Sequence, residues 1–244
     1  MKKSLLVLAV VAAFAPVLAQ AEAGDFVVRL RATNVSPDES SSLGATTTAN
    51  HPAGLTGTTA YGNPNAQLRV DSNTIPEIDF SYYITKNIAA ELILAVGTRH
   101  DVKINTLNTT ATGAITQNGL GSVNLLPPTL TGQWHFNPDQ TFDPYVGAGV
   151  SYVRAMDNGL AAVNSVTTPL PIRINRNSFG PAIQVGFDYN LENKWLLNFD
   201  VKKIWFDTKV ELNTNSLSAG SGWTKIDQLS VDPWVVSVGF GRKF

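Results

Sequence analysis

Apolar residues alternate with small or polar residues along much of this chain, and this two-residue period constrains the fold more than any other feature of the sequence. The C-terminal segment is the clearest case: Trp234, Val236 and Val238 share one face, whereas Ser237 and Gly239 share the other. Successive side chains of a β-strand point to opposite faces of its sheet. No segment after residue 24 sustains the 3.6-residue period of an amphipathic helix. The pattern therefore predicts an all-β protein.

Eight segments carry the alternation or the composition of strands, and we expect eight strands. They cover residues 25–35, 77–84, 88–97, 124–136, 143–154, 179–189, 195–207 and 234–244. Three connections are short and rich in turn-forming residues, at 85–87, 137–142 and 190–194. Four are long and polar, at 36–74, 98–123, 155–177 and 208–230. Because short and long connections alternate, each kind is expected at its own end of the sheet.

Two kinds of β-protein fit this pattern. A soluble sandwich or lipocalin-like barrel turns its apolar face inward, whereas an outer-membrane barrel turns that face toward lipid. Long strands, an even strand count and alternating loop lengths favour the membrane barrel. So do the aromatic residues near strand ends, which are Trp134, Phe136, Tyr145, Tyr189, Trp195, Trp205, Trp234 and Phe244. Since lipid offers no hydrogen-bond partners, we predict a closed, eight-stranded antiparallel transmembrane β-barrel with four long extracellular loops and three short periplasmic turns.

The N-terminus predicts export. Two lysines precede an apolar run over residues 5–18, which has the length of a signal-peptide core and is short for a membrane-spanning helix. Small residues then offer several cleavage sites within 19–23, and we expect cleavage after Ala21. Residues 1–21 would then be a signal peptide, and residues 22–244 a barrel in the outer membrane of a Gram-negative cell.

Composition and motifs argue against other classes. The chain has no cysteine, and its 18 basic residues are scattered along the sequence, which argues against nucleic acid as a partner. The histidines His51, His100 and His135 lack metal-ligand spacing and are expected to be solvated, so we expect no metal, no cofactor and no enzymatic activity. Some eight-stranded barrels modify lipid A, and His100 beside Arg99 and Asp101 is the best candidate for such a site.

Strand parity places charged residues on the inner face of the barrel, where buried charges must pair. These residues are Arg29, Arg31, Glu77, Asp79, Glu91, Asp188, Asp200, Lys202 and Lys243. They form either an ion-pair plug that closes the barrel or a polar floor beneath a hydrophobic chamber. An eight-stranded barrel is too narrow for an open aqueous pore.

Small residues on the same face leave room for a chamber, unless they only accommodate large neighbours such as Tyr83, Tyr145 and Phe206. They are Ala95, Gly97, Thr129, Thr131, Gly147, Gly149, Ser151, Gly180, Ala182 and Gly186. Proline cannot donate a hydrogen bond to a neighbouring strand. We therefore expect Pro127, Pro128 and Pro181 to interrupt the sheet and to open the wall.

Five groups of short strings occur in a specific order and spacing. They are AGDF at 23–26, LPPTL at 126–130 with QW at 133–134, PYVGAG at 144–149, QVGFDY at 184–189 and VDPWV at 231–235. In these strings the chain resembles the outer-membrane protein W (OmpW) family of Gram-negative bacteria, which also includes alkane-uptake barrels. The resemblance covers the whole mature chain.

The resemblance implies an eight-stranded barrel that gives small hydrophobic molecules passage from the cell surface, with exit sideways through a gap in the wall. In this family a hydrophobic constriction lies at the chamber floor, and by local match Ile93 takes the position of one constriction residue. Lys202 stands where the resemblance implies an aromatic residue. The gate is therefore expected to be different or partly electrostatic.

The predicted function is passive uptake of small hydrophobic molecules through the outer membrane. The alternative is a structural or adhesive barrel that meets phage or host through its loops, because the first loop spans 39 residues, from 36 to 74. Expected partners are the lipid bilayer, lipopolysaccharide and a small hydrophobic substrate. The terminal Phe244 also resembles the C-terminal signature that outer-membrane assembly machinery recognises.

Overall fold

The computed structural model describes residues 22–50, 65–95, 97–105, 119–163, 169–215 and 222–244. The expected signal peptide, residues 1–21, lies outside this part. In chain order the elements are β1 (Phe26–Ser36), α2 (Leu43–Asn50), β2 (Gln67–Val70), β3 (Asn73–Tyr83), β4 (Ile88–Ala95), β5 (Thr98–Asn105), β6 (Gly119–Leu126), β7 (Thr129–His135), β8 (Phe142–Asn158), β9 (Ala161–Val163), β10 (Pro169–Ile174), β11 (Asn177–Asn190), η2 (Glu192–Lys194), β12 (Trp195–Ile204), β13 (Asp207–Asn213), β14 (Trp223–Ser230) and β15 (Trp234–Lys243).

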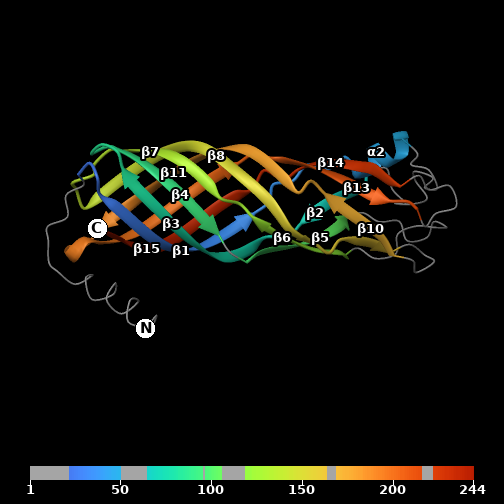
Figure 1. Cartoon of the computed structure of the whole chain (residues 1–244), viewed down its shortest axis with the longest axis horizontal. Helices are drawn as coiled ribbons and strands as arrows, with labels where there is room; N and C mark the ends of the chain where they lie inside the picture. Colours follow the sequence, from blue (N-terminus) through green and yellow to red (C-terminus); the bar gives the residue numbers. More distant parts are fainter. Residues whose placement is uncertain (1–21, 51–64, 96, 106–118, 164–168, 216–221) are drawn as a thin grey trace, which may run out of the picture.

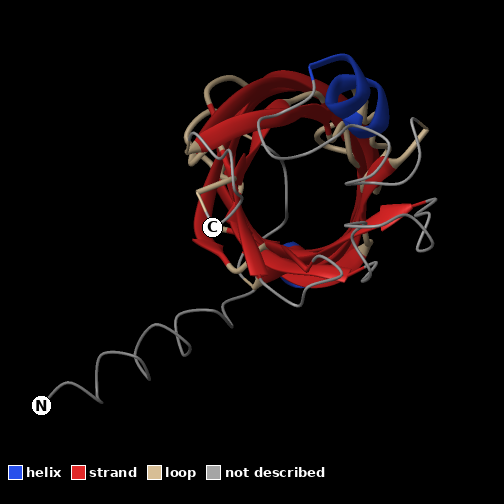
Figure 2. Cartoon of the chain, turned by 90° about the vertical axis from the view of Figure 1, so that its right-hand side faces the viewer, coloured by secondary structure: helices blue, strands red, loops and turns tan. Residues whose placement is uncertain are grey.

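Eight of these strands close into a barrel. Their order around the wall is β11, β12, β15, β1, β3, β4, β7 and β8, and the pairing of β8 with β11 completes the ring. Each of these neighbours pairs antiparallel. Viewed along the barrel axis, the strands surround a common centre (Figure 2). The predicted eight-stranded antiparallel barrel is thus confirmed.

The two ends of the barrel differ, as the connection lengths predict. The three short connections lie at the end where the chain terminates, and α2, β10, β13 and β14 lie at the other (Figure 1). At the first end, backbone hydrogen bonds between Phe26 and Phe244 join β1 to the C-terminus. No helix in the described part of the chain has the length and apolar character needed to cross a membrane.

The four segments predicted as long loops contain regular structure of their own. β2, β5, β9, β10 and β14 lie within the segments predicted as loops, β13 lies within one except for its first residue, and β6 and β8 extend into them. β6, β5 and β2 continue the wall beyond β8, while β14, β13, β10 and β9 form a separate four-stranded sheet. Alternation persists there, for example in buried His100, Val102 and Ile104. Because polar residues dominate these segments, composition concealed their strand period.

The two faces of the wall divide as the sequence pattern predicts. Large apolar side chains are exposed on the outside, among them Leu30, Leu92, Val185, Leu197 and Val238. Side chains of the opposite parity are buried in the lumen. An apolar outer band and a polar interior are typical of a barrel surrounded by lipid.

A charge on the outer band should therefore destabilise the barrel according to its depth. Val238 lies at the middle of its strand, and we expect Val238→Arg to lower the free energy of unfolding in lipid vesicles by about 2–4 kcal/mol. Asn34→Arg, near the end of the lipid-facing row of β1, should cost about 0–1 kcal/mol. Urea unfolding of both variants measures the difference, and equal losses would contradict this placement of the bilayer.

Candidate transport chamber

An ion-pair cluster crosses the lumen, and Arg31 lies at its centre. Its guanidinium nitrogens lie 3.0 Å from Asp79 Oδ2, 3.0 Å from Glu91 Oε1 and 3.3 Å from Glu77 Oε1. All four side chains are buried. β1, β3 and β4 supply these groups, so the cluster links three adjacent strands across the interior.

Two further cations extend this cluster across the barrel. Arg29 binds Asp188 of β11 with two nitrogens, at 2.5 and 3.2 Å. Lys202 Nζ lies 2.5 Å from Asp200 Oδ1 and 3.5 Å from Glu77 Oε1. The inward positions predicted for the charged residues are thus confirmed, Lys243 included, which is buried beside the ring of Tyr83.

Uncharged polar residues extend the hydrogen bonding, and two of them, Gln133 and Gln184, are not among the site residues predicted from the sequence. Gln133 and Gln184 donate to Glu91 Oε2 at 2.8 and 3.0 Å, and the Tyr145 hydroxyl donates to Asp200 at 2.8 Å. Strand parity alone could have identified these side chains as inward-facing. Buried ion-pair networks of this kind resist the passage of ions, because an entering ion must displace existing partners.

A lower cavity of about 60 Å³ lies directly above the charged cluster. Glu77 and Lys202 reach its lining, and Ile93 lies beside them. The two residues predicted for the constriction therefore occur at the same cavity. The remaining lining is largely apolar and includes Val35, Ile75, Pro127, Ile204, Pro233 and Val235.

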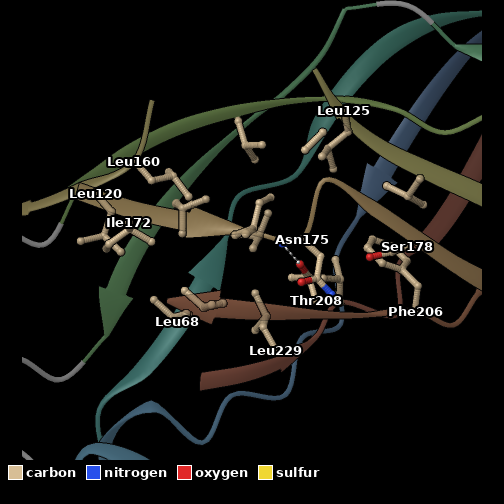
Figure 3. A pocket seen from close by; sticks show the side chains of 18 residues that line it. Leu68, Leu120, Leu125, Leu160, Ile172, Asn175, Ser178, Phe206, Thr208 and Leu229 are labelled. Atoms are coloured by element: carbon tan, nitrogen blue, oxygen red, sulfur yellow. Dashed lines mark hydrogen bonds between the residues drawn. The ribbon is translucent and has the colours of Figure 1, made fainter. Parts of the chain in front are cut away.

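An upper cavity of about 50 Å³ continues toward the loop end of the barrel (Figure 3). It is lined mainly by aliphatic side chains, with Asn175, Ser178 and Thr208 on one side. Five residues line both cavities: Val70, Leu125, Val153, Phe206 and Val231. Together the two cavities form an apolar space that we call the chamber.

Helix α2 contributes to the roof of the chamber. Leu43 is fully buried in the same apolar cluster as Leu68, Leu212 and Ile226. Asp227 Oδ1 accepts a hydrogen bond from the backbone N–H of Ser42 at 2.9 Å, which holds the start of the helix against β14. The chamber is thus bounded by charges below and by packed apolar side chains above.

One interruption of the wall lies at Pro181. The β11–β12 ladder ends at the pair of Ala182 and Ile204, and beyond it Trp205 N–H donates to Pro181 O at 3.1 Å. Since N–H and C=O of one strand residue point to the same side, the donor that Pro181 lacks would face Trp205. Gly180 approaches the backbone of Trp205, just after β12, so closely that a Cβ atom on Gly180 would meet Trp205 O at 1.6 Å. We call this boundary the Pro181 seam.

A second interruption involves Pro127 and Pro128. The β4–β7 ladder ends at Ile93 and Thr129, whereas the β5–β6 ladder begins only at Thr98 and Leu125. Pro128 O accepts a hydrogen bond from β8, and Pro127 lines the lower cavity at the gap. Both proline sites therefore lie at breaks in the sheet, whereas the opening of the wall at these sites stays a prediction.

The small inward residues play different roles. Ala95 and Thr129 line the lower cavity. Gly147 and Gly186 instead accommodate Gln184 and Tyr145, because a Cβ atom on either glycine would lie within 3 Å of those side chains. The prediction that Gly97 faces the lumen is wrong: it is exposed, with φ of +75°, at the break between β4 and β5.

The prediction that the histidines are solvated is wrong for His100 and His135. His100 lines the lower cavity, and His135 is fully buried with Nδ1 2.7 Å from Asp143 Oδ2. Arg99 and Asp101 are exposed on the opposite face of β5 from His100, so these three residues do not form one site. His51 lies outside the described residues.

His135, Asp143 and Asp188 are the described residues whose arrangement comes nearest to a metal site, because their potential ligand atoms lie within 4.8 Å of one another. Arg29 and Asn198 already donate to the Asp188 carboxylate. Asp143 similarly accepts from the backbone N–H of Asn137. These contacts fit a structural hydrogen-bond network better than a metal site, because a cationic guanidinium repels a metal ion.

The closed wall and its apolar outer band define an outer-membrane β-barrel. The OmpW family model matches residues 22–244, and the chain belongs to the OmpW family. Outer membrane protein W of Vibrio cholerae is 31% identical over the full length of both chains, and outer membrane protein AlkL of Ectopseudomonas oleovorans is 31% identical over 74% of this chain and 70% of its own. The crystal structure of OprG from Pseudomonas aeruginosa shares 30% identity and a TM-score of 0.71, covering 91% of this chain and 97% of its own.

Proposed function

We propose that this protein is a passive channel through which small hydrophobic molecules enter the cell. The observation that carries the proposal is the chamber: an apolar space closed below by ion pairs. An apolar solute gains about 25 cal/mol for each Å² of surface that it buries there. An ion gains no such term and loses its hydration, so the chamber favours hydrophobic molecules.

We further propose that the solute leaves sideways into the bilayer. The charged cluster offers it no apolar path toward the short turns. The Pro181 seam and the gap at Pro127 both adjoin residues that line the chamber, namely Phe206 and Thr129. Fewer backbone hydrogen bonds hold the wall at these sites, so they are the places where it opens most readily.

Uptake by intact cells tests the proposal. Cells that express the protein should take up a small hydrophobic compound faster than cells that lack it, whereas uptake of a small sugar should be the same in both. If loss of the protein leaves hydrophobic uptake unchanged, the transport function is refuted. The structural or adhesive alternative would then take its place. The chamber favours transport over that alternative, because a structural or adhesive barrel does not require an apolar chamber.

Replacing Pro181 by valine tests the lateral exit. Valine supplies the N–H that Pro181 lacks, and this donor would face Trp205 O across the seam. One added hydrogen bond of about 1 kcal/mol should lower the open fraction, and hence the uptake rate, about fivefold. Pro144→Val, at the other end of the barrel, is the matched control and should leave the rate unchanged. Equal rates for wild type and Pro181→Val would place the exit elsewhere.

The other expected partners follow from the location of the barrel. The exposed apolar band contacts the lipid bilayer. The chain ends in an exposed phenylalanine, Phe244, that directly follows a strand of the wall, and we propose that the assembly machinery binds this strand before the barrel closes.

A further inference from the structure

Basic residues that are scattered in the sequence meet on one outer side of the barrel, and the chamber does not use them. Arg154 lies on β8, two residues beyond Tyr152 in the outward-facing row. Arg176 is exposed and lies beside it, since its carbonyl accepts a hydrogen bond of 2.9 Å from Ala155 N–H. Both residues adjoin the lipid-facing part of the wall at its loop end.

Three more cations continue this surface away from the membrane. Arg173 Nε lies 2.6 Å from Glu211 Oε2, and Lys209 Nζ lies 2.5 Å from Glu211 Oε1. Lys225 lies opposite Glu211 in the register of β13 and β14. Arg173 also stacks over Trp223, 4.3 Å from the ring centroid. The hydrogen bonds from Arg173 and Lys209 lower the pKa of Glu211. This carboxylate therefore stays charged but offsets only one of the three cations.

The basic patch, defined as Arg154, Arg173, Arg176, Lys209 and Lys225, is not balanced by its neighbours. Asp157, Asp207 and Glu211 are the carboxylates on the same strands and the same outer side, which leaves an excess of two positive charges. Several other described cations at this end are paired with a single carboxylate. Arg69, Lys103 and Lys203 each form an ion pair with a carboxylate.

Exposed aromatic side chains lie directly below the two arginines nearest the membrane. The rings of Tyr152 and Phe179 lie 4.8 Å apart, and Phe179 is 72% exposed. Pro181 follows in the same outward row of β11. An apolar surface with cations immediately above it matches a lipid that carries acyl chains below an anionic head.

We propose that this surface binds lipopolysaccharide, with a lipid A phosphate at Arg154 and Arg176 and the acyl chains against Tyr152 and Phe179. Neither Arg154 nor Arg176 forms an ion pair with a carboxylate of the described residues, so the charge of both guanidinium groups remains available to such a phosphate. Guanidinium groups bind phosphate with charge-assisted, often bidentate hydrogen bonds. Lipopolysaccharide is the phosphorylated lipid of the leaflet that this end of the barrel faces.

The test uses the full-length mature protein in detergent, with lipid A as the probe and native mass spectrometry as the measurement. Arg154→Gln/Arg176→Gln should weaken the binding of bisphosphorylated lipid A about tenfold or more, because each charge-assisted hydrogen bond contributes on that order. The control Arg69→Gln/Lys103→Gln removes the same charge from the same end of the barrel and should change the affinity less than twofold. Unboiled gel mobility reports whether each variant is folded.

A second arm keeps the wild-type protein and changes the lipid. Lipid A without phosphates should bind wild type as weakly as the double variant binds the phosphorylated form. If both lipids bind wild type equally, or if the control variant loses as much affinity as Arg154→Gln/Arg176→Gln, the proposal is overturned. Hydrophobic uptake plays no part in this readout, so its result and that of the transport test are independent.

Discussion

Replacing Arg31 by methionine should lower the free energy of unfolding by about 3–5 kcal/mol, the largest stability loss that we expect from one substitution in the lumen. Methionine keeps most of the side-chain volume but leaves Asp79, Glu77 and Glu91 without their shared partner. Buried carboxylates that lose a cation pay their desolvation cost without compensation. Urea unfolding of the refolded barrel in lipid vesicles measures the loss.

A double variant separates charge from packing. Arg31→Met/Glu91→Gln removes one of the carboxylates that Arg31 compensates, so it should recover part of the lost stability, and the two substitutions should be strongly non-additive. Lys103→Met, which removes an exposed cation paired with Asp71, should cost less than about 1 kcal/mol. If Arg31→Met also lowered the free energy of unfolding by less than about 1 kcal/mol, water would have to reach the cluster and solvate its carboxylates.

The parity of the strands could be predicted because the wall separates lipid from lumen residue by residue. A charged side chain such as that of Glu91 or Asp188 is very costly on the lipid side of the wall. Such a residue must therefore face the lumen, and its place in the alternation tells which face of the strand is the inner one. The same rule could have identified Gln133, Gln184 and His135, since their positions match. Uncharged polar residues carry a weaker signal, because a glutamine or a histidine is tolerated on a solvated face as well.

The outer half of the barrel was harder to predict. Above the bilayer the outer face contacts water, so Thr, Asn and Lys occupy strands there, and β5 and β13 have the composition of loops. In β10 two prolines, Pro169 and Pro171, obscure the strand instead. Their inward residues nevertheless keep the two-residue period, as Ile172 and Val210 do. The chamber itself depends on side chains from many strands, and its volume follows from packing that no single segment specifies.

Replacing Ile93 by aspartate should slow hydrophobic uptake at least about tenfold, approaching the rate of cells without the protein, because an apolar solute must then pass an unpaired buried charge. Ile93 lines the lower cavity and pairs across the strands with Asp79, next to a cluster that already holds more carboxylates than arginines and lysines. The new carboxylate finds no free cation there, since Lys202 already binds Asp200 and Glu77. Water drawn to this charge would also occupy the space that the solute needs.

The matched control is Ile93→Val, which shortens the side chain but keeps the cavity apolar, and which should leave the uptake rate within about twofold of wild type. Unboiled gel mobility verifies that both variants fold, and uptake of a small sugar controls for leakage. If Ile93→Asp slows uptake and Ile93→Val does not, the polarity of the chamber floor controls entry. If cells with Ile93→Asp take up the compound at the wild-type rate while cells without the protein do not, the solute leaves the barrel above Ile93, and the upper cavity with the Pro181 seam would form the complete route.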